Sequence, residues 1–388
     1  MTSHLMPTYN PLPISFSHGQ GAWLWDQAGK AYLDALTGIA VCALGHAHPK
    51  ITATIQEQAQ KLLHTSNVFR IDQQERLAQK LTELSGMDNA FFASSGAEAN
   101  ETALKLCRLW GREKNKELPY IIVTDYAFHG RTLATLSASG SRSIQAGFEP
   151  LVPGFIRVPF NDVKAIQTVL ENRKDVVAIM VEPIQGNGGI KIPSKDYLIQ
   201  LRQLCDQHDC LLVLDEIQTG IGRTGKWFAY QHTSILPDIL TSAKSLGNGI
   251  PIGACLARGK AAQLFQPGQH GSTFGGNPFV CAVALAVLNT IEEENLLPQV
   301  EKMGGLLSQA LNETLSNHSK VKAIRGQGLM FGVELSEPCH RLLELALQEG
   351  LLVNVTAESV VRILPPYIIK PDEVAEIGAR LQKAITRF

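Results

Sequence analysis

Residues 90–110 of the chain, AFFASSGAEANETALKLCRLW, decide its fold class. The opening run AFFAS is apolar and aromatic, as expected of a buried strand. From Ala97 onward, apolar or small residues recur with a period of about 3.6, at Ala99, Ala103, Leu106, Cys107 and Trp110. This period predicts an amphipathic helix. A strand that leads directly into a helix is typical of α/β proteins.

Further short apolar runs indicate that the strand at 90–94 belongs to a larger sheet. They are YIIVT at 120–124, VVAIMVE at 176–182, LLVLDE at 211–216 and PIGACLA at 251–257. Continuous apolar runs of this length suit strands that are covered on both faces, and their spacing leaves room for a crossover helix each time. We therefore predict a doubly wound α/β domain with a large, mostly parallel sheet.

The two ends of the chain have a different pattern. GAWLWD at 21–26 and KAYLDAL at 30–36 predict a hairpin, whereas MFGVELS, HRLLELALQEG and LLVNV, between 330 and 355, predict a strand, a helix and a strand. We expect these ends to form a smaller α+β domain. The predicted division is an N-terminal segment at 1–55 that contributes to the small domain, a large domain at 56–280 and a C-terminal small domain at 281–388.

Composition excludes several classes of function. The 388 residues include 35 Lys and Arg against 36 Asp and Glu, so a net charge of −1 gives no overall attraction to nucleic acid or to an anionic membrane. The longest apolar stretch, Phe279 to Leu288, is shorter than the roughly 18 residues of a membrane span. The N-terminus lacks a secretory signal pattern, and seven cysteines without a C-x-x-C pair argue against a disulfide framework. We expect a cytoplasmic protein.

Three motifs carry candidate chemistry, each with a plainer alternative. Ser94–Asn100, SSGAEAN, lies where the strand becomes the helix, and it suits either a phosphate cradle or an ordinary serine N-cap. Asp215 ends an apolar strand, so it either faces a buried cationic ring nitrogen or caps the next turn. Lys244 lies among small residues in TSAKSLGNG, and it is either a Schiff-base lysine or a solvated charge.

Metal binding is the less favoured interpretation of two further clusters. His46 and His48 are two residues apart, but no cysteine or acid lies at a recognisable zinc-ligand spacing. Cys205, His208 and Cys210 lie in or next to a stretch with a helical pattern, which indicates a structural role. We therefore expect no metal site.

Six motifs occur in one chain and in a fixed order: SSGAEANE, FHGRT, VEPIQG, LVLDEIQTGIGRTG, TSAKSLGNGIPIGA and STFGGNP. Together they resemble the class III aminotransferases, enzymes of pyridoxal 5′-phosphate with the aspartate-aminotransferase-like fold, called fold type I. The resemblance extends over essentially the whole chain, from GAWLWD to VVRILPP. It also implies a structural role for the GHAHP histidines, since the family uses no metal there.

The resemblance implies cofactor roles for matching positions. Lys244 would bind the cofactor's aldehyde covalently, and Asp215 would keep the pyridine nitrogen protonated. Gln218 would bond the ring hydroxyl and Phe128 would stack on the ring. The remaining cofactor-binding residues would be Ser95, Gly96 and Ala97 at the phosphate, Thr273 reaching the same phosphate from the neighbouring subunit of a homodimer, and Glu216 and Ile217 beside Asp215.

Substrate roles follow in the same way. Arg131 and Arg362 would each bind a substrate carboxylate, and Ser272 would touch an acylated substrate across the dimer interface. The FHGRT and HGSTFGGNP wording implies transfer of the terminal amine of N-acetylornithine to 2-oxoglutarate. Ornithine, succinylornithine and 4-aminobutyrate remain alternative donors, and a protein that only stores or senses the cofactor remains the non-enzyme alternative.

Two positions depart from the family wording. Many relatives have a glutamate at the position of Asn187, where it is thought to mask the arginine that matches Arg362. An asparagine can bond a guanidinium but cannot neutralise it, so we expect Arg362 to be less masked here. The stretch SNVFRIDQQ also differs, and its Arg70 could add a charge near the entrance of the site.

Overall fold

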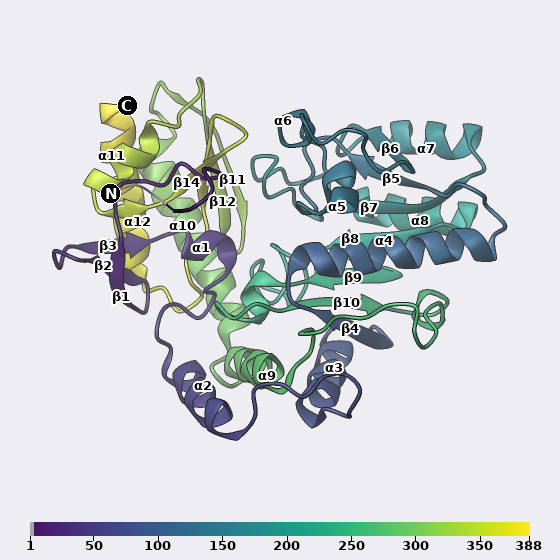
Figure 1. The fold of residues 1–388 in the computed structure, drawn as a ribbon. Helices are drawn as coiled ribbons and strands as arrows, with labels where there is room; N and C mark the ends of the chain where they lie inside the picture. Colours follow the sequence, from purple (N-terminus) through teal and green to yellow (C-terminus); the bar gives the residue numbers. More distant parts are fainter. Residues whose placement is uncertain (1–3) are drawn as a thin grey trace.

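The computed structural model describes residues 4–388. Its largest element is a seven-stranded sheet, whose strands lie one above another at the right of Figure 1. In spatial order its strands are β4 (Asn89–Ala93), β10 (Gly253–Ala257), β9 (Ile239–Ser242), β8 (Leu211–Asp215), β7 (Val176–Val181), β5 (Tyr120–Thr124) and β6 (Phe155–Val158). Only β10 runs in the opposite direction to the other six strands, so the prediction of a large, mostly parallel sheet is confirmed.

The central strands are apolar on both faces because helices cover both. Every residue of β7, β8 and β10 is buried. The covering and flanking helices are α2 (Pro49–Lys61), α3 (Asp72–Ser85), α4 (Gly96–Glu113), α5 (Leu133–Ala138), α6 (Arg142–Gln145), α7 (Val163–Asn172), α8 (Tyr197–His208) and α9 (Pro278–Glu293). The helix predicted after the strand at 90–94 is α4, which crosses the sheet in Figure 1.

One part of the strand pattern was predicted wrongly. We expected a crossover helix between all neighbouring apolar runs, but a long loop joins β8 to β9 and contains only the short 3₁₀ turn η1 (Ala229–His232). Strands β6 and β9 also escaped prediction. Both have four residues and carry polar side chains, Arg157 in β6 and Thr241 and Ser242 in β9. The other predicted strands match to within about two residues at each end, which is the usual accuracy of sequence boundaries.

Two four-stranded sheets lie at one end of the molecule. The first contains β1 (Phe16–Gln20), β2 (Trp23–Asp26), β3 (Ala31–Asp34) and β13 (Leu351–Leu352), and the second contains β11 (Val321–Gln327), β12 (Met330–Leu335), β15 (Val360–Ile363) and β14 (Asn354–Thr356). The predicted single strand LLVNV is therefore wrong. It divides between β13 and β14, because its first residues pair with β3 and its last residues with β15.

The N-terminal strands thus share a sheet with the C-terminal part of the chain. Leu33 pairs with Leu351 in parallel register, and the amide of Leu33 donates to the carbonyl of Gly350 at 2.8 Å. The purple and yellow segments lie together at the left of Figure 1, with α10 (Leu296–Leu315), α11 (Leu342–Gln348) and α12 (Pro371–Arg387) beside them. The predicted domain boundaries, at 55 and 280, fall inside helices α2 and α9. The division into domains stays a prediction.

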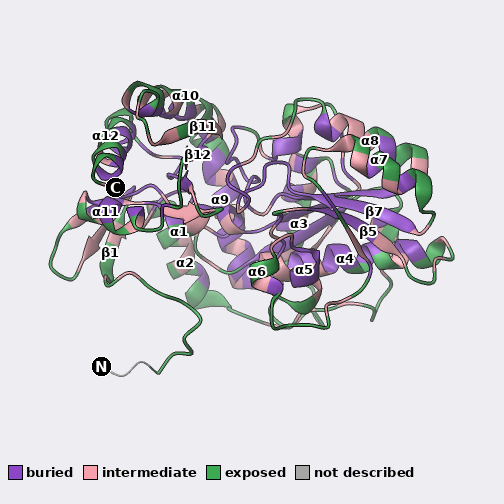
Figure 2. Cartoon of the chain, turned by 90° about the horizontal axis from the view of Figure 1, so that it is seen from above, coloured by how far each residue is buried: buried purple, intermediate pink, exposed green. Residues whose placement is uncertain are grey.

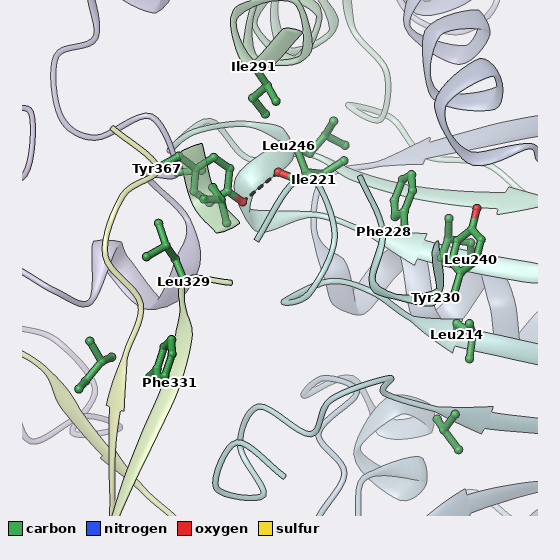
Figure 3. Packing of buried hydrophobic residues seen from close by; sticks show 14 of the residues in the cluster. Leu214, Ile221, Phe228, Tyr230, Leu240, Leu246, Ile291, Leu329, Phe331 and Tyr367 are labelled. Carbon is green, nitrogen blue, oxygen red and sulfur yellow. Dashed lines mark hydrogen bonds between the residues drawn. The ribbon is translucent and has the colours of Figure 1, made fainter. Parts of the chain in front are cut away.

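The core continues from the large sheet to this end of the molecule. Figure 2 shows buried residues running through the middle of the sheet and between the helices. In the close view of Figure 3, Tyr367 reaches toward the loop that follows β8, and its hydroxyl donates to the carbonyl of Ile221 at 2.9 Å. This bond, with the packing of Leu246 and Leu329 nearby, fixes the loop that carries Gln218. Within residues 4–388, no helix has both the length and the apolar character that a bilayer crossing needs.

Candidate active site

A cavity of about 360 Å³ lies at the carboxyl ends of the parallel strands, where α/β sheets bind ligands. It receives side chains from the start of α4, from the loops after β5, β7 and β8, and from the turn after β9. Nine of the predicted site residues line it: Ser95, Gly96, Ala97, Phe128, Arg131, Asp215, Ile217, Gln218 and Lys244. Residues separated by up to about 150 positions in sequence thus meet around one space.

Four predicted residues do not line this cavity. Arg362 lies behind Gln218, to which it is hydrogen bonded. Glu216 turns away, because its carboxylate accepts from the amides of Ala229 and Tyr230, each at 2.9 Å. Ser272 and the exposed Thr273 lie in a separate loop near the edge strand β4, where Ser272 borders another pocket. Arg70 is exposed and lies outside the cavity lining as well.

The start of α4 combines both interpretations of the SSGAEAN motif. Ser95 is the N-cap, and its hydroxyl oxygen accepts from the amide of Glu98 at 3.3 Å. The next two amides, of Gly96 and Ala97, donate to no other group within residues 4–388. Unpaired amides at the start of an 18-residue helix favour an anion, because the helix dipole adds positive potential there. The cap and the phosphate cradle are thus compatible.

The loop that carries Phe128 is held tightly against this helix start. Gly130 has a φ of 141°, and a Cβ there would lie only 2.9 Å from the Cβ of Ala97, so glycine is required by both backbone and space. The guanidinium of Arg131 lies over the ring of Phe128, 5.7 Å from its centroid. The loop therefore presents an aromatic face and an exposed cation at the cavity.

Asp215 is the centre of a buried polar cluster. One carboxylate oxygen, Oδ2, accepts from Nδ1 of His129 and from Nδ2 of Asn100, each at 2.7 Å, and Oδ1 accepts from the amide of Ile217 at 3.1 Å. Burial alone lowers the pKa of His129, but its hydrogen bond to Asp215 and the charges of Asp215 and Glu182 raise that pKa above its ordinary value. His129 and the carboxylate of Asp215 therefore form a buried pair beside the cavity, with 2.7 Å between Nδ1 and Oδ2.

Lys244 has the features of a reactive amine. Its backbone is in the left-handed region, with φ 45°, at the point where β9 gives way to the 3₁₀ turn η2 (Lys244–Leu246). Within residues 4–388 its amine makes no hydrogen bond or ion pair. Desolvation, reinforced by the charge of Arg362 and opposed by Asp215, lowers the pKa of Lys244 to about 8. A useful fraction of this amine is therefore uncharged and nucleophilic near neutral pH.

Arg362, on β15, is almost fully buried and is held by neutral groups. Only 2% of its surface is exposed. Its Nε donates to Oδ1 of Asn354 at 3.0 Å, and its Nη1 donates to Oδ1 of Asn187 at 2.9 Å and to Oε1 of Gln218 at 3.2 Å. Burial lowers the pKa of Arg362 to about 10. Asn187 therefore bonds this guanidinium without neutralising it, as expected from the sequence.

The clusters first considered for metal have other partners. Nε2 of His46 lies 2.7 Å from the carboxylate of Asp34, and Nε2 of His48 lies 3.7 Å from that of Glu294. Cys205 is buried in α8 and Cys210 is buried just after it, both as free thiols. These contacts support structural roles.

The sequence analysis missed three residues that shape the cavity: His129, Asn100 and Glu182. A signal existed for all three, since His129 lies inside FHGRT, Glu182 inside VEPIQG and Asn100 inside SSGAEANE. None of these motifs shows the contact itself, because Asn100 meets Asp215 from 115 positions away.

Comparisons with known proteins agree with this geometry. The Aminotransferase class-III family model matches residues 5–385. Acetylornithine aminotransferase of Nitrosomonas europaea is 52% identical over 386 residues, covering 100% of this chain and 98% of that protein. The crystal structure of acetylornithine aminotransferase from Elizabethkingia anophelis has a TM-score of 0.90 at 37% identity, covering 99% of this chain and 97% of that one. Ornithine aminotransferase of Toxoplasma gondii has a TM-score of 0.95 at 34% identity, covering 99% and 93%.

The chain therefore belongs to the class III aminotransferases and has their fold, type I of the pyridoxal-phosphate enzymes. It is a pyridoxal-phosphate-dependent transaminase, and the relative described above with the highest sequence identity, 52% along the whole chain, is an acetylornithine aminotransferase. The family assignment favours an enzyme over a protein that only stores the cofactor.

The cavity fits pyridoxal phosphate on four observations. Unpaired amides at the start of α4 suit the phosphate, and the ring of Phe128 offers a stacking face. The carboxylate of Asp215 suits a protonated ring nitrogen, and the free amine of Lys244 suits an aldehyde. All of these groups line one cavity.

Proposed function

We propose that this chain transfers the terminal amine of N-acetylornithine to 2-oxoglutarate, which gives N-acetylglutamate semialdehyde and glutamate, as a step of arginine biosynthesis. The observation that carries the proposal is the end-to-end similarity to acetylornithine aminotransferases, in a chain whose matching residues line one cavity. The two arginines at this site, Arg131 and Arg362, support an amine donor and an amine acceptor that both carry carboxylates.

The residue roles follow from the geometry. When bound, pyridoxal phosphate supplies an aldehyde that takes up the donor's amine and a ring that withdraws electrons from the adjacent carbon. Asp215, paired with His129, would supply a carboxylate to the ring nitrogen. Lys244 accepts a proton from the donor carbon that carries the amine and later gives it up, which its lowered pKa permits. We assign the phosphate to Ser95, Gly96 and Ala97, and the ring contacts to Gln218, Phe128 and Ile217.

The two arginines divide the carboxylates. Arg362 lies deep, next to Gln218, and we assign it the α-carboxylate of the acceptor. Arg131 is exposed at the rim, beside Phe128, so it suits the carboxylate of N-acetylornithine or the distal carboxylate of 2-oxoglutarate. Arginine suits both positions because its planar fork makes two parallel charge-assisted bonds.

We also propose a homodimer in which Ser272 and Thr273 complete the partner subunit's site. Asn67 donates to the carbonyls of Ser272 and Gly275, at 3.1 and 3.0 Å, so residues 66–69 lie beside this loop. Large apolar side chains are exposed there, Val68 at 82%, Phe69 at 67% and Phe274 at 63%. Exposed large apolar side chains on neighbouring segments are typical of an interface. Glu216 would act on the cofactor only indirectly, by fixing the loop after Asp215.

We place the enzyme in the cytoplasm, with small molecules as its reaction partners. All seven cysteines lie within residues 4–388, and each is a free thiol. Six of them are buried, which suits a reducing compartment.

A donor screen tests the proposed substrate. With 2-oxoglutarate as the fixed acceptor, kcat/KM for N-acetylornithine is expected to exceed that for ornithine and for 4-aminobutyrate by at least about tenfold, because a pocket shaped for an acyl group gains roughly 1–3 kcal/mol from it. Succinylornithine is expected to come closest. A higher kcat/KM for ornithine or 4-aminobutyrate would assign the enzyme to that donor instead.

The neutral bond between Asn187 and Arg362 predicts the behaviour of Asn187→Glu. A carboxylate at this position would neutralise the guanidinium and compete with the α-carboxylate of glutamate. We expect the half-reaction with glutamate to slow by about tenfold, equal to about 1.4 kcal/mol, while the half-reaction with N-acetylornithine changes less than about threefold. Stopped-flow absorbance of the cofactor measures both rates, and Asn187→Gln is the neutral control. An unchanged ratio of the two rates would show that Asn187 does not control access to Arg362.

A further inference from the structure

The cavity contains a buried acid, Glu182, in addition to Asp215. Glu182 directly follows β7, lines the cavity and is only 5% exposed. Its Oε2 accepts from the amide of Phe128 at 3.1 Å, and its Oε1 accepts from the amide of Gly186 at 3.2 Å. Each oxygen thus holds one loop, the first carrying the aromatic face and the second carrying Asn187.

The charges that face Glu182 come from four other elements. They are His129 after β5, Asp215 on β8, Lys244 after β9 and Arg362 on β15. No lysine, arginine or histidine within residues 4–388 forms an ion pair with Glu182 at contact distance. Burial raises the pKa of Glu182 to about 7, an effect that Asp215 strengthens and His129 opposes. This acid can therefore exchange a proton near neutral pH.

Glu182 is also the anion that acts on Arg362. The guanidinium is bonded only to amide oxygens, and the charge of Glu182 stabilises its cationic form. The link between them is short, because Glu182 binds the amide of Gly186 while the next residue, Asn187, binds the guanidinium. Carboxylate and guanidinium are therefore bonded to adjacent residues of one turn, and the charge of Glu182 acts on Arg362 without an ion pair at contact distance.

We propose that Glu182 is a positioning residue that serves as a reversible counter-charge for Arg362, ionised while no substrate carboxylate is bound and protonated once one binds. The inference rests on the proposed function, because it takes Arg362 as the carboxylate-binding group. The physical reason is that two anions beside one buried guanidinium repel each other, and the acid that is not bonded to the guanidinium relieves this by accepting a proton. Arg362 can then stay in place during both half-reactions.

This counter-charge makes carboxylate binding depend on pH in a defined direction. In the protein without a bound carboxylate, the pKa of Glu182 is about 7. Binding of a carboxylate raises this pKa further, so a proton is taken up when the ligand binds. Affinity is then highest below pH 7 and falls as the pH rises toward the pKa of the bound form. For one linked proton the loss is at most about tenfold per pH unit. Without the acid this part of the pH dependence disappears.

The experiment uses the holoenzyme and glutarate, which has both carboxylates of 2-oxoglutarate but no carbonyl and so binds without reacting. The dissociation constant is measured from the cofactor's absorbance between about pH 6.5 and pH 8.5, and proton uptake by calorimetry in two buffers of different ionisation enthalpy. For the wild type we expect weakening by about three- to tenfold over this range and uptake of part of a proton. For Glu182→Gln we expect a nearly constant dissociation constant and no uptake from this group.

Two variants complete the test. Glu182→Asp keeps the charge and is expected to keep the proton uptake, even where the shorter side chain weakens binding. Glu334→Gln removes an acid from β12, the strand that pairs with the Arg362 strand, and must leave the uptake unchanged. A Glu182→Gln profile parallel to that of the wild type would overturn the inference, since a merely structural role shifts affinity equally at every pH. Failure of the wild type to bind glutarate would also overturn it, and turnover of N-acetylornithine in the same preparation shows whether the proposed function survives.

Discussion

Replacing Lys244 with alanine is expected to lower the transamination rate by at least about 10,000-fold. The amine at this position combines two functions, nucleophile toward the cofactor's aldehyde and proton carrier at the substrate carbon, and positioned proton transfer alone contributes about 100- to 10,000-fold. The amine is free of hydrogen bonds in the described part of the chain, and its pKa of about 8 lies close to neutrality. The measurement is the single-turnover rate with N-acetylornithine, followed by the cofactor's absorbance.

Two controls separate this chemistry from charge and from folding. Lys244→Arg keeps a positive charge but cannot lose a proton near pH 7, so we expect it to be as inactive as the alanine variant. Lys260→Ala removes a solvated lysine whose amine contacts Asp209 at the surface, and it is expected to change the rate by less than about twofold. An alanine variant that keeps a few per cent of the wild-type rate would contradict the assigned role.

The second large effect is expected at Asp215. Asp215→Asn preserves the size of the side chain but removes the buried negative charge that accepts from His129 and Asn100. An amide cannot balance the charge of a protonated ring nitrogen, so we expect kcat to fall by about 100- to 1,000-fold, equal to about 2.7–4.1 kcal/mol of barrier. Weaker cofactor binding is expected as well. The measurements are kcat at saturating pyridoxal phosphate and the dissociation constant of the cofactor.

Asp238 provides a matched control for this prediction. It lies just before β9, at the opposite end of the sheet from the cavity, and its carboxylate accepts from Arg202 and from the amide of Leu212, each at 2.7 Å. Asp238→Asn is expected to lower the melting temperature but to leave kcat per folded molecule within about twofold of wild type. Equal losses of kcat in the two variants would show that Asp215 acts only through stability.

Much of the fold could be predicted from the sequence because the central strands are buried on both faces. Runs such as VVAIMVE and LLVLDE have no other stable place than a covered sheet. Strands β6 and β9 could not be found in this way, since Arg157 in one and Thr241 and Ser242 in the other interrupt a run that is only four residues long. Local propensity predicts LLVNV as one strand because it cannot show that two different sheets pair with its two ends.

The candidate site was predictable to the extent that motifs carry it. Lys244, Asp215 and Gln218 lie in recognisable stretches, and all three line the cavity. His129 and Asn100 were missed because their importance arises from contacts with Asp215 across 86 and 115 positions of sequence. Single-residue patterns do not encode such contacts. One sequence does not show which residues a partner subunit contributes to the site. The roles of Ser272 and Thr273 across a dimer interface are therefore proposals.

The central claim is that the amine of Lys244 is the group that binds pyridoxal phosphate covalently. It is tested most directly by reducing the purified holoenzyme with borohydride, digesting it and locating the pyridoxyl label by mass spectrometry. The account predicts a single labelled residue, Lys244, in the peptide that contains TSAKSLGNG. A label on any other lysine, or no label in a preparation that is active before reduction, would contradict the account.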